Sequence, residues 1–251
     1  MDLGLADRRF LVGGASRGLG AAVVRALHGE GARVAGVSRS PTADSAEAGV
    51  NLAIDLSAPD GPSQAVSEAV AALGGLDGLV VNSGGPPGGT FSTVVEGAWE
   101  RAIAGTLMSS IRLVREALPH LREGRDPAIV VVLSSSVREP IPALVTSNVL
   151  RPGLAGLIKT LVGEIAPIRI NGVAPGRFDT ERVRSLDEAR AAETGEAIET
   201  IQAQMRARIP LGRYGDPDEM GRVVAFLLSP AASYLDGVIL PVDGGMMRSL
   251  P

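Results

Sequence analysis

The 251-residue sequence contains no cysteine and few aromatic residues. Without cysteine it has no disulfide, no thiolate nucleophile and no Cys-ligated zinc site. The two histidines, His28 and His120, are far apart and neither has metal-ligand spacing around it, so we expect no metal site. One Trp, two Tyr and four Phe are too few for a substrate pocket built on ring stacking.

Long apolar runs and an excess of positive charge are also missing. The net charge of −4 favours neither nucleic acid nor an anionic membrane as a partner. No run approaches the roughly 18 apolar residues that cross a bilayer. Residues 1–9, which carry Asp2, Asp7, Arg8 and Arg9, do not resemble a signal peptide. We therefore expect a cytoplasmic protein.

Seven short apolar segments rich in β-branched residues are spaced along the chain. Their apolar residues are continuous rather than alternating, which is typical of strands buried on both faces of a parallel sheet. The predicted strands are Phe10–Val12, Arg33–Val37, Leu52–Ile54, Leu79–Val81, Ile129–Leu133, Ile168–Val173 and Val238–Val242.

Segments of helical length, rich in Ala, Leu, Glu and Arg, separate these strands. Their alternation predicts an α/β fold: a doubly wound, mostly parallel, Rossmann-like sheet with helices on both faces. No linker divides the chain, so we expect one domain over residues 1–251, with a helical flap over 178–208, where no strand is predicted. The predicted helices span roughly 19–29, 62–73, 96–122, 147–166 and 217–228.

A glycine-rich turn follows the first predicted strand and opens the first helix. It reads Gly13-Gly14-Ala15-Ser16-Arg17-Gly18-Leu19-Gly20, a G-x-x-x-G-x-G spacing. Glycines there let the backbone approach a diphosphate, whose charge is met by the helix N–H groups and dipole. No Lys-Ser/Thr follows the last glycine, so this is not a Walker loop. The turn predicts a dinucleotide site, the alternative being a turn without a ligand.

The end of the second strand bears on the choice of cofactor. Sites specific for NAD place an acid there, on the ribose 2′-hydroxyl. Here the position reads Ser38-Arg39, and Arg17 lies inside the glycine turn. Two guanidinium groups can make charge-assisted bonds to a 2′-phosphate, which favours NADP(H) over NAD(H). The alternative is that both arginines are solvated surface residues.

Five motifs together resemble the short-chain dehydrogenase/reductase family along nearly the whole chain. Besides the glycine turn, Asp55-Leu56 stands where the family's acid meets the adenine, and Asn82-Ser83-Gly84 where the family has Asn-Ala-Gly. Pro175-Gly176 with Thr180 resembles the turn that holds the nicotinamide side, and Val242-Asp243-Gly244-Gly245 is similar to the C-terminal signature. Within the family, the resemblance is nearest to reductases of the 3-oxoacyl-carrier-protein type.

The resemblance implies a set of residues that contact the cofactor, most of them in these motifs. They are Gly14, Ser16, Arg17, Gly18, Leu19, Gly20, Ser38, Arg39, Asp55, Leu56, Asn82, Ser83, Gly84, Arg151, Pro175, Gly176 and Thr180.

The family's catalytic residues are matched less well. Its members transfer hydride between nicotinamide and a carbonyl carbon, with a Tyr as proton donor, a Lys four residues later, a Ser after the fifth strand and an Asn in the preceding helix. Ser135 fills the Ser position, although the run Ser134–Ser136 allows a slip of one. The Tyr, Lys and Asn positions are taken by Ser147, Arg151 and Thr106.

The replacements keep part of this chemistry. Ser147 and Arg151 are four apart and share one helix face. Arg151 can hold ribose hydroxyls but does not shuttle protons, and an aliphatic hydroxyl is a weaker acid than a phenol of pKa about 10. The alternative is that Ser147 caps the helix, because Thr146-Ser147-Asn148 is a run of residues that favour caps and Pro152 cannot donate to the carbonyl of Asn148. Thr106 is expected to bond back to its own helix.

Two functions follow as alternatives. One is an NADP(H)-dependent oxidoreductase acting on a small or acyl carbonyl through Ser135, Ser147, Arg151 and ordered water. The other is a catalytically silent homologue that binds NADP(H) and serves as a binding or assembly partner. We expect an aliphatic pocket lined by residues 139–143 and the flap. One interpretation of Arg138 is that it meets an acidic group of a substrate or carrier, the alternative being a solvated surface residue. The family's tetramers suggest a homo-oligomer, either tetramer or dimer.

Overall fold

The computed structural model describes residues 2–41 and 49–249. Within these ranges seven strands form one parallel sheet of order β3-β2-β1-β4-β5-β6-β7, which confirms the predicted doubly wound fold. The order reverses between β1 and β4, and ligands bind at such switch points, beyond the carboxyl ends of the strands. The strands are β1 (Arg9–Gly13), β2 (Arg33–Ser38), β3 (Val50–Ala53), β4 (Gly78–Val81), β5 (Ala128–Val132), β6 (Arg169–Pro175) and β7 (Ile239–Val242).

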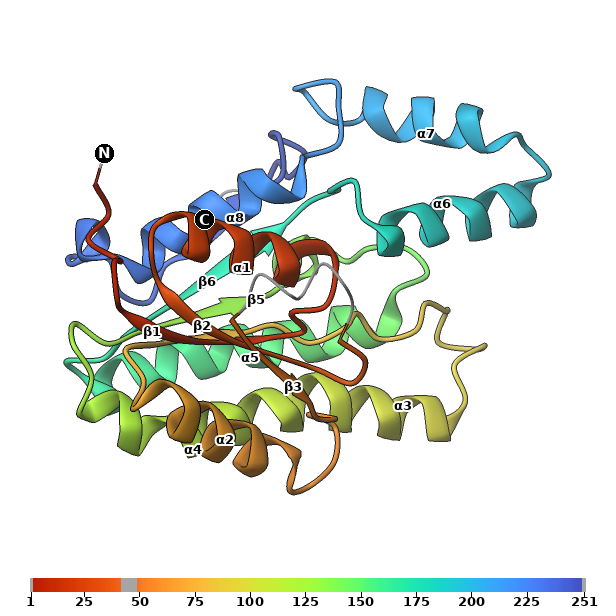
Figure 1. The fold of residues 1–251 in the computed structure, drawn as a ribbon. Helices are drawn as coiled ribbons and strands as arrows, with labels where there is room; N and C mark the ends of the chain where they lie inside the picture. Colours follow the sequence, from red (N-terminus) through yellow and green to blue (C-terminus); the bar gives the residue numbers. More distant parts are fainter. Residues whose placement is uncertain (1, 42–48, 250–251) are drawn as a thin grey trace.

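Helices cover both faces of the sheet (Figure 1). One face carries α1 (Gly18–Gly29) and α8 (Pro217–Leu228), and the other carries α2 (Gly61–Leu73), α4 (Ser109–Arg122) and α5 (Val145–Ile165). Two short 3-10 helices, η3 (Ser135–Val137) and η4 (Pro230–Ala232), follow β5 and α8. No helix in the described ranges has both the length and the apolar character to cross a bilayer.

The two core layers follow from the alternation of side chains along each strand. Leu11, Leu79 and Ile129 point to the side of α2, α4 and α5. Their neighbours Phe10 and Val130 point to the side of α1 and α8. Both sets are fully buried, so the central strands β1, β4 and β5 contribute to both layers and read as continuous apolar runs.

The segment predicted as one helix over 96–122 differs from that expectation. It consists of α3 (Glu96–Ala102), a π-helical turn η2 (Ile103–Met108) and α4. The Ser109 and Ser110 hydroxyls donate to the carbonyls of Gly105 and Thr106, at 2.7 and 2.6 Å, where the backbone ladder is widened. Thr106 is buried inside this π-helical turn, a feature that often occurs at functional sites.

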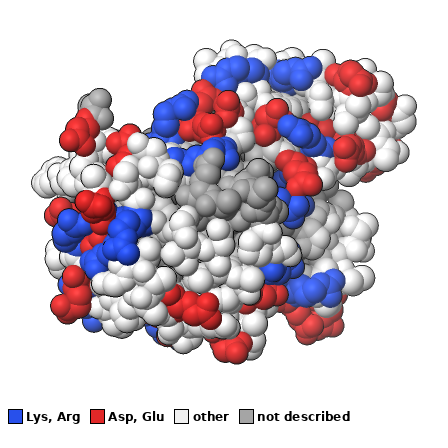
Figure 2. Space-filling model, viewed as in Figure 1, with Lys and Arg blue, Asp and Glu red and all other residues white. Residues whose placement is uncertain are grey.

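The segment 178–208 holds α6 (Glu181–Thr194) and α7 (Ile198–Ala207), a hairpin that projects from the body in Figure 1. Acidic and basic side chains are interspersed over this hairpin in Figure 2. Its base is fixed by the buried Asp187, which pairs with Arg177 and accepts a hydrogen bond from the Tyr214 hydroxyl at 2.8 Å. This anchor keeps the first turn of α6 close to the sheet.

At the opposite end of the strands, the fully buried Asp77 carboxylate joins three segments. It accepts hydrogen bonds from the backbone and guanidinium of Arg9, at 2.8–2.9 Å, and from the backbone N–H of Arg125 at 2.7 Å. Burial alone would raise the pKa of Asp77, but these hydrogen bonds outweigh it and lower the pKa from 3.8 to about 2. The ionised carboxylate therefore stabilises the folded state.

Asp77→Asn should lower the free energy of unfolding at pH 7 by about 1–2 kcal/mol. Because the folded pKa lies below the unfolded one, this contribution is complete above about pH 4 and disappears as the pH falls toward 2. Urea unfolding of both proteins at pH 7 and pH 3 should therefore show a smaller difference at pH 3. The control Asp218→Asn removes an exposed ion pair with Arg25. If Asp77→Asn lowered the free energy of unfolding by the same amount at both pH values, the stabilising role of the ionised carboxylate would be contradicted.

Candidate active site

The β1–α1 turn has the shape of a diphosphate cradle. Gly14 and Gly18 adopt the left-handed φ values of +59° and +56°. A Cβ on Gly20 would lie 2.1 Å from the carbonyl oxygen of Gly14, so only glycine allows this approach. Helix α1 begins at Gly18, and its N-cap residue Arg17 supplies no side-chain cap. The first-turn N–H groups are therefore available to an anion, which fits the predicted dinucleotide.

Asn82, at the end of β4, holds this turn in place. Its amide nitrogen lies 3.1 Å from the carbonyl oxygen of Gly13 and 3.5 Å from that of Gly14. The next residue, Ser83, has a buried hydroxyl without a hydrogen-bond partner among the described residues. Gly84 faces open space. In the Asn82–Gly84 motif the Asn82 side chain is therefore held in place, and the Ser83 hydroxyl is left to bind a ligand.

The end of β2 and the segment after β3 form the predicted adenosine side. Asp55 accepts hydrogen bonds from the backbone and hydroxyl of Ser57, at 2.9 and 2.7 Å. Its partial burial raises the pKa, but these bonds and the charge of the exposed Arg39 outweigh that effect, so the pKa is lowered. Ser38 ends β2, and Leu56 packs on the core. The structure therefore brings Arg39 close to the acid predicted to meet the adenine.

Arg17 points toward α6 in this structure. Its guanidinium forms an ion pair with Glu181 at 2.6 Å, and both side chains are 68% exposed. The methyl group of Thr180 lies 3.5 Å from where a Cβ on Gly18 would be. The β6–α6 turn therefore adjoins the glycine turn, and Thr180 also caps α6 through the N–H of Val183.

The Pro175-Gly176 motif packs against the C-terminal signature. Pro175 ends β6, and a Cβ on Gly176 would lie 2.6 Å from the Cβ of Asp243. Asp243 in turn accepts hydrogen bonds from the N–H groups of Gly245 and Met247, at 2.9 and 2.7 Å. Two motifs that are far apart in the sequence thus form one structural unit beside the site.

A pair of buried serines lies beyond the carboxyl end of β5. The hydroxyl oxygens of Ser136 and Ser147 are 3.1 Å apart, and these residues are 4% and 6% exposed. Ser135, the residue predicted at the family's Ser position, is also buried, and the hydrogen bond to Ser147 is made by Ser136. Ser134 holds the short turn by accepting the Ser136 N–H at 3.1 Å.

Ser147 is not the cap of its helix. Helix α5 begins at Val145, two residues earlier than predicted, so Ser147 lies in its first turn and its hydroxyl is free to meet Ser136. Pro152 lies inside α5. The Asn148 side chain instead binds the backbone N–H and C=O of Ile141, both at 2.9 Å, which fixes the loop before the helix.

Arg151 is a buried cation on the same face of α5 as Ser147. It is 5% exposed, and its Nη1 donates to the carbonyl of Val132 at the end of β5. Its Nε has no hydrogen-bond partner among the described residues. Burial, followed by the charge of Arg182, lowers the pKa of Arg151 to about 10, so the guanidinium stays charged at neutral pH. Arg182 was not identified from the sequence.

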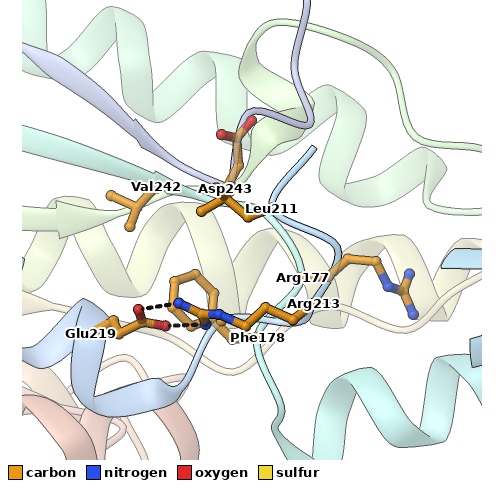
Figure 3. A pocket seen from close by; sticks show the side chains of 9 residues that line it. Arg177, Phe178, Leu211, Arg213, Glu219, Val242 and Asp243 are labelled. Atoms are coloured by element: carbon orange, nitrogen blue, oxygen red, sulfur yellow. Dashed lines mark hydrogen bonds and ion pairs between the residues drawn. The ribbon is translucent and has the colours of Figure 1, made fainter. Parts of the chain in front are cut away.

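A cavity of about 120 Å³ lies at the base of the flap, beside the β6–α6 turn (Figure 3). Arg213 points toward Glu219 there and makes two contacts of 2.7 Å with it. Arg177 extends away from that pair and binds Asp187. The charged groups of Arg177, Arg213 and Glu219 at the cavity thus have ion-pair partners, and Arg151 does not line the cavity.

Comparisons with known proteins agree with this geometry. A family model described as enoyl-(acyl carrier protein) reductase matches residues 14–247. The 3-oxoacyl-[acyl-carrier-protein] reductase FabG of Vibrio cholerae is 30% identical over 253 residues, which cover 97% of this chain and 99% of that protein.

Two solved structures share the fold over almost their full length. L-sorbose reductase from Gluconobacter frateurii, complexed with NADPH and L-sorbose, has a TM-score of 0.91 at 27% identity, covering 100% of both chains. A short-chain oxidoreductase from Pseudomonas aeruginosa PAO1, described as containing an atypical catalytic center, has a TM-score of 0.87 at 31% identity, covering 98% and 99%. From the motifs, the fold and these matches, the chain belongs to the short-chain dehydrogenase/reductase family.

Proposed function

We propose that the protein is an NADP(H)-dependent oxidoreductase that interconverts a small or acyl carbonyl compound and its alcohol at an atypical catalytic centre. The observation that carries the proposal is the buried group formed by Ser136, Ser147 and Arg151 beyond β5. Ser147 and Arg151 occupy the positions of the family's Tyr and Lys. Relatives named as acyl and sugar reductases support the carbonyl substrate class.

The cofactor would lie across the switch point of the sheet. The N–H groups of the turn over residues 14–20 would hold the diphosphate, with Asp55 and Leu56 at the adenine and Ser83 and Thr180 on the nicotinamide side. Arg39, with Arg17 released from Glu181, would meet the 2′-phosphate. NADPH bound there would supply a hydride to the carbonyl carbon of the substrate.

The residues of the chain then provide the proton and the charge. The Ser147 hydroxyl would donate a proton to the oxygen of the reduced carbonyl and recover one through Ser136 and water. Because a serine hydroxyl is a weak acid, the donor needs help, and the fixed charge of Arg151 would stabilise the negative oxygen in a dry site. Arg151 acts as a fixed charge and does not donate the proton, because a guanidinium keeps its proton in a protein.

The silent-homologue alternative is favoured by one observation. The Nη1 group of Arg151 is already committed to the Val132 carbonyl, and no phenol lies on this face of α5. A protein of this kind would bind NADP(H) without turning over a carbonyl substrate. The two functions are separated by the turnover experiments that follow.

Ser147→Ala should lower the kcat for carbonyl reduction on the order of 100-fold, because it removes the proposed proton donor. The rate is followed as the loss of NADPH absorbance with a panel of ketones and 3-oxoacyl thioesters. The NADPH Kd should stay unchanged, and the control Ser185→Ala, on the exposed side of α6, should retain full activity. An unchanged kcat in Ser147→Ala would remove Ser147 from the reaction.

The wild-type protein tests the alternative in the same assay. NADPH binding without turnover of any substrate in the panel would support a silent homologue. In that case the double variant Ser147→Tyr, Arg151→Lys should gain turnover, since it restores the family's residues.

NADPH should bind more tightly than NADH, and Arg39→Asp should weaken NADPH binding by about tenfold or more while leaving NADH binding intact. Isothermal titration calorimetry measures both affinities. Arg33→Asp is the matched control because it removes an exposed arginine at the opposite end of the same strand. Equal affinities of the wild-type protein for the two cofactors would contradict the role of Arg39.

We also propose that the protein is a homo-oligomer, either a tetramer or a dimer. Large apolar side chains are exposed around α3 and α5, among them Phe91, Val95, Ile103 and Val149. Val149→Asp should shift the species seen by size-exclusion chromatography with light scattering toward the monomer. The control Tyr234→Asp, also at an exposed position, should not. A monomeric wild-type protein would contradict the proposal.

A further inference from the structure

The guanidinium of Arg151 lacks a countercharge. It is 5% exposed, its Nε has no partner in the described part of the chain, and its one recorded acceptor is the neutral carbonyl of Val132. The neighbouring charge that acts on it is another cation, Arg182, which lowers its pKa further. A buried charge is costly unless it is paired, so this arrangement calls for an anion.

Arg182 lies in the first turn of α6, over the loop that follows β4. Its Nη2 donates to the carbonyl of Pro86 at 2.6 Å, and its Nε lies 3.0 Å from where a Cβ on Gly85 would be. The next residue of that loop, Pro87, accepts a hydrogen bond from Thr146 at 3.1 Å, in the first turn of α5. Arg182 therefore reaches the same end of α5 that carries Ser147.

Four other arginines at or near the base of the flap have acidic partners. Arg17 pairs with Glu181, Arg177 with Asp187, Arg184 with Asp179, and Arg213 with Glu219. Figure 2 shows the same mixture of signs over α6 and α7. Among residues 2–41 and 49–249, neither Arg151 nor Arg182 forms an ion pair with a carboxylate.

We propose that Arg151 and Arg182 together bind a carboxylate of the substrate, so that the substrate is a short oxo acid or the corresponding hydroxy acid. The inference rests on the proposed function and specifies its substrate class. A carboxylate accepts paired hydrogen bonds from guanidinium groups and would supply the missing negative charge. Held next to Ser147, it would place a nearby carbonyl within reach of the proton donor.

The diphosphate of the cofactor is the competing source of negative charge. It would be held by the turn over residues 14–20 at the start of α1, where helix N–H groups are available. The nicotinamide amide and the ribose hydroxyls, which would lie nearer Arg151, carry no negative charge. The anion expected between Arg151 and Arg182 is therefore that of the substrate.

The test uses binding rather than turnover. Protein saturated with NADP⁺, which cannot reduce an oxo acid, is titrated calorimetrically with pyruvate, acetoacetate and levulinate, each compared with its methyl ester. At least one acid should bind about tenfold or more tightly than its ester. Arg182→Gln should abolish this preference, and Arg182→Lys should restore part of it. Equal binding of acid and ester for all three compounds would overturn the proposal.

Three further measurements identify the residue that causes a preference for the acid over its ester. Arg208→Gln, which removes an exposed guanidinium at the end of α7, should leave the preference for acid intact. Loss of the preference in Arg138→Gln rather than in Arg182→Gln would assign the carboxylate to Arg138 and overturn the proposal. If Arg182→Gln weakened NADP⁺ binding and left the preference for acid unchanged, Arg182 would be assigned to the cofactor. This result would also overturn the proposal.

The same titration without nucleotide separates the inference from the proposed function. Acid binding that depends on Arg182 in a protein that binds no NADP(H) would support the carboxylate site while the proposed function fails. NADP(H) binding together with turnover of neutral ketones, and no preference for acids, would support the proposed function and overturn the carboxylate site.

Discussion

The site depends on one close contact between two backbone segments. Gly20 packs against the carbonyl of Gly14 so tightly that any side chain there would collide with it, and the Asn82 amide binds the carbonyls of Gly13 and Gly14. This contact sets where α1 begins and directs its N–H groups beyond the carboxyl edge of the sheet. It also fixes the turn against β4, at the point where the strand order reverses. A dinucleotide crevice follows from this geometry.

The second constraint is the cost of burying Arg151. A flexible lysine at this helix position could retract its charge or lose its proton more readily than a guanidinium, which stays charged. The burial of the Arg151 guanidinium against the end of β5 therefore fixes a permanent positive charge on the helix face that carries Ser147. In the proposed reaction, the weak acidity of Ser147 and the charge of Arg151 would be complementary, because the charge would stabilise the oxygen that the hydroxyl protonates. A carboxylate of the substrate would supply the negative partner that Arg151 does not have among the described residues.

Much of the fold was predictable because the central strands of the sheet are buried on both faces and read as apolar runs. The glycine turn was predictable because its spacing has a steric cause. The break at Thr106 was not, since no residue type in Ile103–Met108 distinguishes a π-helical turn from an α-helical one. Ser136 was hidden by the run of identical residues before it. Arg182 became visible only when α6 was placed against the loop after β4, a contact between residues almost a hundred positions apart.

The central claim is that the Gly14–Gly20 turn and the Ser147–Arg151 face of α5 are two ends of one cofactor site. A crystal structure of the protein with bound NADP⁺ tests it directly. The claim predicts diphosphate oxygens on the N–H groups of the turn, with Ser147 and Arg151 within about 3.5 Å of the nicotinamide riboside or of a substrate beside it. A nicotinamide ring positioned away from α5, with the Ser136–Ser147 pair undisturbed, would contradict it.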